Sequence, residues 1–67
     1  MDINRLRCEI IKNGATYEDV AKEIGVSTGT FKRKMKNKSF GIMEARVMVE
    51  MLNIKDPEEI FFKEELT

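Results

Sequence analysis

The chain has 67 residues, a length that allows one small domain with a modest hydrophobic core. It contains no histidine and a single cysteine, Cys8, which excludes a disulfide scaffold or a cysteine-histidine zinc site within the monomer. Its net charge is zero. The lone thiol fits a reducing compartment, and the sequence shows neither a membrane-spanning apolar run nor a signal-peptide pattern. We therefore expect a cytoplasmic protein with no membrane partner.

The first predicted helix runs from about Asp2 to Lys12, because its apolar residues recur at helical spacing. Asn13 and Gly14 then form a stop signal. The side chains that we expect to face the core are Ile3, Leu6, Ile10 and Ile11.

The segment from Thr16 to Lys36 predicts two short amphipathic helices joined by a tight turn at Gly25. Thr16 is an N-cap residue, and Asp19 three positions later has the spacing of a capping box. Gly25 lacks a Cβ and therefore suits the left-handed end of the first of these helices. Its buried face is predicted to consist of Val20, Ala21 and Ile24.

The second helix of this segment is predicted over residues 27–37, with Ser27 as its N-cap. Phe31 and Met35 lie four residues apart and form its buried stripe. The residues left on the solvent side are Thr28, Gly29, Lys32, Arg33 and Lys36.

The rest of the chain predicts a loop and two more helices. Phe40 lies in a loop bounded by Lys38 and Gly41, where it folds back over the core, and a helix follows from about Ile42 to Leu52. Asp56 and Pro57 then begin a short fifth helix. The residues that we expect the fourth helix to bury are Ala45, Met48, Val49 and Leu52, and the apolar residues of the fifth are Ile60, Phe61 and Leu66. Residues 1–67 therefore predict a single all-α domain, a compact bundle of four to five short helices containing a helix-turn-helix.

The charges of the chain are unevenly distributed although they cancel overall. Residues 26–40 contain five basic and no acidic side chains, whereas residues 41–67 contain three basic and seven acidic ones. A local positive patch attracts phosphate groups, and acidic flanks limit indiscriminate binding. The alternative is that these lysines only solvate an exposed helix face.

The segment resembles the helix-turn-helix of the phage repressor/Cro family. The resemblance rests on Ala21, the Gly25-Val26-Ser27 turn, Thr30-Phe31 and Arg33, and it extends more weakly through Leu52-Asn53-Ile54 to Ile60-Phe61-Phe62. It implies a lambda-repressor-like domain of a phage- or prophage-encoded repressor. Such a protein binds double-stranded DNA sequence-specifically and regulates transcription by inserting helix 27–37 into the major groove. Gly29 departs from the family pattern, since many members have a long base-reading side chain there.

The resemblance also implies the contact residues by their positions in the motif. The residues that it places at base edges are Thr28, Gly29, Lys32 and Arg33. Arg33 is suited to bidentate contact with guanine, and Thr28 to a thymine methyl group. The expected phosphate contacts come from Thr16, Tyr17, Ser27, Lys36 and Lys38. Three of them also have a purely structural interpretation. Thr16 and Ser27 cap helices in any case, and the ring of Tyr17 would pack beneath the first helix.

No catalytic arrangement is visible, so we expect neither an enzyme nor a cofactor, metal or small-molecule substrate. The adjacent Phe61 and Phe62 cannot both face the same core, which makes a homodimer through the C-terminal helix a possible arrangement. The alternative is that both pack on the monomer, one against the first helix and one beneath the loop at Phe40. A second hypothesis for the function stays open. The chain would then be a helix-turn-helix-derived interaction module that binds another regulator, or itself, without binding DNA.

Overall fold

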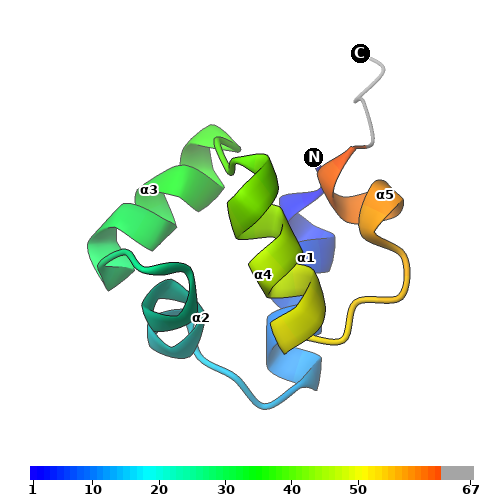
Figure 1. Ribbon diagram of the computed structural model, residues 1–67, viewed down its shortest axis with the longest axis horizontal. Helices are drawn as coiled ribbons and strands as arrows, with labels where there is room; N and C mark the ends of the chain where they lie inside the picture. Colours follow the sequence, from blue (N-terminus) through cyan, green and yellow to red (C-terminus); the bar gives the residue numbers. More distant parts are fainter. Residues whose placement is uncertain (63–67) are drawn as a thin grey trace.

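The structure of the protein is a computed structural model, and it describes residues 1–62. This part of the chain contains five helices and no strand: α1 (Ile3–Lys12), α2 (Tyr17–Ile24), α3 (Thr28–Asn37), α4 (Ile42–Met51) and α5 (Pro57–Phe61). They form a small all-α bundle in which α2 packs against both α3 and α4, and α5 packs against α1 (Figure 1). The prediction of an all-α bundle is therefore confirmed.

Local hydrogen bonds at the helix ends explain where the first two helices begin. The Asp2 carboxylate accepts from the backbone N–H of Arg5 at 3.1 Å, which makes Asp2 the cap of α1 rather than its first residue. The predicted capping box of α2 is present, since Thr16 Oγ1 accepts from Asp19 N at 3.1 Å and the Asp19 carboxylate accepts from Thr16 N at 2.9 Å. These bonds satisfy backbone donors that have no partner within the helix.

The core is built from one or two apolar residues of every helix and two from the segment between α4 and α5. Its buried members are Leu6, Ile10, Val20, Ala21, Phe31, Met35, Ala45, Met48, Leu52, Ile54 and Ile60. Phe31 is fully buried, and the Phe40 ring lies against it at a centroid distance of 5.5 Å, as expected of a loop residue that folds over the core. The five helices thus depend on one shared core.

Two hydrogen bonds between distant segments hold the two ends of α1. The backbone N–H of Asp2 donates to the carbonyl of Ile60 at 2.7 Å, which ties the start of α1 to α5. At the other end, Asn13 Nδ2 donates to the carbonyl of Leu52 at 2.9 Å, just beyond α4. The long-range partners of α1 therefore lie in the C-terminal third of the chain.

One expectation was wrong, one is confirmed in position but not in its side-chain bond, and one lies outside the described residues. Ile11 was predicted to face the core but is 69% exposed, because it follows the buried Ile10 by one residue and turns off the stripe that Leu6 and Ile10 form. Asp56 occupies the cap position of α5 without a side-chain capping bond, and its carboxylate instead faces Arg5 at 3.8 Å. Leu66 lies outside the described residues.

Candidate nucleic-acid interface

The start of α3 is set by the three-residue turn that follows α2. Gly25 has φ +85°, the left-handed conformation that its lack of a Cβ permits. Val26 N then donates to the carbonyl of Ala21 at 2.9 Å, and Ser27 Oγ accepts from Thr30 N at 3.1 Å. The turn therefore determines the direction in which α3 leaves α2.

Helix α3 has a buried face and a cationic face. Phe31 and Met35 are buried, as predicted. The exposed residues Gly29, Arg33 and Lys36 follow one another at spacings of four and three, so they lie on one face, and the exposed Lys32 borders it. We call Gly29, Lys32, Arg33 and Lys36 the cationic face of α3.

The predicted base-contacting residues separate into two groups in the structure. Gly29, Lys32 and Arg33 lie together on the cationic face, whereas Thr28 is half-buried at the first position of α3. Within residues 1–62, no carboxylate lies within ion-pairing distance of Lys32, Arg33 or Lys36. A phosphate that approached these three cations would not have to displace an acidic group of residues 1–62.

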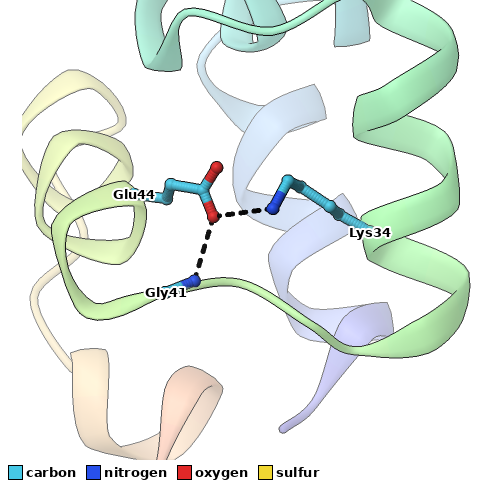
Figure 2. A network of polar contacts seen from close by, with 3 residues as sticks. All are labelled: Lys34, Gly41 and Glu44. Carbon is cyan, nitrogen blue, oxygen red and sulfur yellow. Dashed lines mark hydrogen bonds and ion pairs between the residues drawn. The ribbon is translucent and has the colours of Figure 1, made fainter.

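Lys34 belongs to the same run of basic residues but, unlike Lys32, Arg33 and Lys36, pairs with an acidic side chain within residues 1–62. Its Nζ lies 3.2 Å from Glu44 Oε1, and the two side chains are only 26% and 21% exposed. The same carboxylate oxygen accepts from the backbone N–H of Gly41 at 2.9 Å (Figure 2). Lys34 therefore joins α3 to the first turn of α4 and does not contribute a free charge to the cationic face.

Thr16 and Ser27, two of the three hydroxyl residues expected to contact phosphate, are both engaged as helix caps. Thr16 caps α2 through Asp19, and Ser27 Oγ both accepts from Thr30 N and lies 3.0 Å from Thr30 Oγ1. Glu18 and Asp19 occupy the first turn of α2, and their negative charge opposes an anion at that helix end. Of the two helix starts, that of α3 is the one without acidic side chains in its first turn.

The remaining phosphate candidates lie at different places around α3. Lys36 is on the cationic face, and Lys38 follows the helix in a left-handed conformation at φ +52°. Tyr17 packs its ring against Phe31 at a centroid distance of 5.5 Å, which leaves its hydroxyl group at the surface beside α1. The structure therefore brings Tyr17 close to the buried side of α3 and its hydroxyl close to α1.

Arg7 is a residue of this surface that sequence reasoning missed. Its Nε donates to the Tyr17 hydroxyl at 2.9 Å, and a shallow groove between α1 and α3 is lined by Ile3, Arg7, Tyr17, Lys32, Met35 and Lys36. A signal for it existed in the sequence, since Arg7 takes the i+4 position of the apolar stripe that begins at Ile3. Arg7 thus adds a fourth cation beside the cationic face.

The chain matches no protein-family model, no curated protein and no solved structure. Within residues 1–62, acidic and cysteine side chains form no group of three that would hold a metal ion. Among the described helices, none has both the length and the apolar character that crossing a membrane requires.

Proposed function

We propose that the protein is a sequence-specific double-stranded DNA-binding regulator of transcription, of the repressor type, that inserts α3 into the major groove. The observation that carries the proposal is the cationic face of α3, which is exposed, has no acidic partner within residues 1–62 and is held at a defined angle by the Gly25 turn. The major groove of B-DNA admits one α-helix and displays a distinct pattern of donors and acceptors for each base pair.

The chemistry of the face suits two kinds of contact. Arg33 has the planar fork that binds the O6 and N7 atoms of guanine, and Lys32 is its neighbour. Lys36 and Arg7 both line the groove between α1 and α3, and we propose that they bind phosphate groups of the flanking backbone. We propose that Arg7 and Tyr17 act together at one phosphate, because the Tyr17 hydroxyl already orients the guanidinium group.

Gly29 supports the same proposal through the space around it. A Cβ added at Gly29 would meet no atom within 4 Å, so the packing of the protein itself does not require glycine there. Glycine in a helix costs roughly 0.5–1 kcal/mol relative to alanine. A glycine on the exposed face that nothing in the fold explains is consistent with close approach of the DNA backbone or a base edge to α3.

The proposal is tested by the salt dependence of binding to a random-sequence duplex pool and to the sequences selected from it. We expect log affinity to fall with log salt by roughly 0.9 per phosphate neutralised. Arg33→Ala should cost about 1–3 kcal/mol at a selected site and relax its specificity. Lys55→Ala is the matched control, since it removes one exposed cation from the loop between α4 and α5, away from α3 (Figure 1).

The outcome also separates the two functional hypotheses. If the protein retained the random-sequence duplex pool at low salt no better than an unrelated control protein does, DNA binding would be refuted and the protein-interaction module would be favoured. Equal losses for Arg33→Ala and Lys55→Ala would refute the role of α3. A regulator of this kind would act in the cytoplasm, where bacterial or phage DNA is accessible to it.

A further inference from the structure

Of the four glycines in the chain, all within residues 1–62, Gly29 alone has no conformational or capping reason to be glycine. Gly14 and Gly25 have positive φ values of 68° and 85°, and Gly41 is the N-cap of α4. Gly29 lies at an exposed position in the first turn of α3, where an added Cβ would meet no atom of residues 1–62 within 4 Å. We call this open space the Gly29 notch.

The Gly29 notch lies beside Arg33. The two residues are one helical turn apart on the cationic face, and side-chain positions with this spacing are about 5–6 Å apart. A helical side chain leans toward the N-terminus of its helix, so the aliphatic stem of Arg33 borders the notch. The notch therefore has a backbone floor and an apolar wall, next to the guanidinium group that the proposed function assigns to guanine.

The major groove presents one group that suits a small apolar notch. Among the groups that standard base pairs display there, only the C5-methyl group of thymine is apolar. 5-Methylcytosine carries the same group at the same ring position. A base without it would leave a gap above the glycine, and the walls of a gap lose their van der Waals contacts. Successive bases of a strand rise by about 3.4 Å, so a neighbour of the guanine lies within reach of the notch.

We propose that the Gly29 notch accepts the C5-methyl group of a pyrimidine in the base pair next to the guanine that Arg33 binds. The protein then senses cytosine methylation, because 5-methylcytosine supplies at that position the group that cytosine lacks. This inference rests on the proposed DNA binding. It adds a specificity that the charged side chains of α3 do not provide.

The first test adds or removes single methyl groups in a selected DNA site. Deoxyuridine in place of thymine removes only the methyl group, and 5-methylcytosine in place of cytosine adds only that group. The guanine is located as the base pair at which Arg33→Ala relaxes specificity. At a pyrimidine next to it, the methyl group should raise affinity about threefold to fivefold, the effect of burying one such group. The slope of log affinity against log salt should not change, because the contact is apolar.

The second test fills the notch. Gly29→Ala places a methyl group of the protein where the base methyl group would lie, so duplexes with and without the base methyl group should bind with nearly equal affinity. The variant should remain folded, since alanine favours a helix over glycine. Gly41→Ala is the matched control, because Gly41 lies outside α3 and an added Cβ would meet only Glu44 Oε1, at an ordinary contact distance of 3.8 Å (Figure 2). It should keep the wild-type preference.

Three results would contradict the inference, and they can be told apart. If no duplex is retained, the proposed function fails and this inference fails with it. If the protein selects a site but no methyl group next to the guanine changes its affinity, DNA binding stands and only the inference is wrong. If the methyl effect persists unchanged in Gly29→Ala, another residue of α3 makes the contact, and the assignment to Gly29 is wrong.

Discussion

The basic run of α3 divides into lysines with different functions, and replacing Lys34 and Lys36 separately tests this division. Lys34 pairs with Glu44 at 3.2 Å in a partly buried position, whereas Lys36 is exposed and has no acidic partner within residues 1–62. Methionine keeps most of each aliphatic stem while it removes the charge. Lys34→Met and Lys36→Met are therefore matched variants, two residues apart on one helix.

The stability change follows from the surroundings of the Lys34–Glu44 pair. Hydrogen bonds to charged groups contribute about 1.5–3 kcal/mol, and fully exposed ion pairs contribute about 0.2–1 kcal/mol. Since the Lys34 and Glu44 side chains are 26% and 21% exposed, we expect Lys34→Met to cost an intermediate amount, about 1–1.5 kcal/mol. In a domain of this size, each kcal/mol lowers Tm by about 4–8 °C. Lys36→Met should change stability by less than about 0.5 kcal/mol.

For DNA binding, the order of the two variants should be reversed, with the larger effect from Lys36→Met. Lys36→Met should reduce the slope of log affinity against log salt by roughly 0.9, the value for one phosphate contact, and Lys34→Met should leave the slope unchanged. Thermal unfolding by circular dichroism and salt titration of DNA binding measure the two effects. If Lys34→Met left Tm unchanged and reduced the slope as Lys36→Met does, Lys34 would leave Glu44 to bind phosphate, and the assignment would be wrong.

Three further substitutions test other parts of the structure. Gly29→Ala should stabilise the protein by roughly 0.5–1 kcal/mol in urea unfolding while it weakens DNA binding, and a loss of stability would contradict the open space around that residue. Gly25→Ala should destabilise it by about 1–2 kcal/mol because of the positive φ of +85°, so an unchanged Tm would argue against the left-handed turn. Tyr17→Phe keeps the ring contact with Phe31 but removes the acceptor of Arg7. It should lower DNA affinity several-fold with an unchanged salt slope, and an unchanged affinity would exclude the shared phosphate contact.

Sequence reasoning succeeded where the interactions are local. The Thr16–Asp19 capping box, the Ser27 cap and the left-handed Gly25 each depend on residues within four positions of one another. Their chemistry follows from residue type and spacing alone. The alternation of buried and exposed residues in α3 was predictable for the same reason, because Phe31 and Met35 define the buried stripe of a regular helix.

Sequence reasoning failed where burial was predicted from apolar character alone. Ile11 is as apolar as Ile10, but one helical step carries it out of the core, and the pattern of α1 does not show how wide the buried stripe is. Phe61 and Phe62 illustrate the opposite case. Two adjacent side chains cannot share one face of a helix, and Phe61 is indeed half-buried while Phe62 is exposed.

The sequence by itself determined the helices, the caps of α2 and α3, the turn before α3 and the local concentration of positive charge, because all of these arise between neighbours along the chain. Only the tertiary structure decided which charges stay free. Lys34 meets Glu44 ten residues away, and Arg7 meets Tyr17 across the same separation, because packing of the helices brings these side chains together. Such contacts depend on the relative positions of whole helices, which the shared core sets and no local pattern encodes.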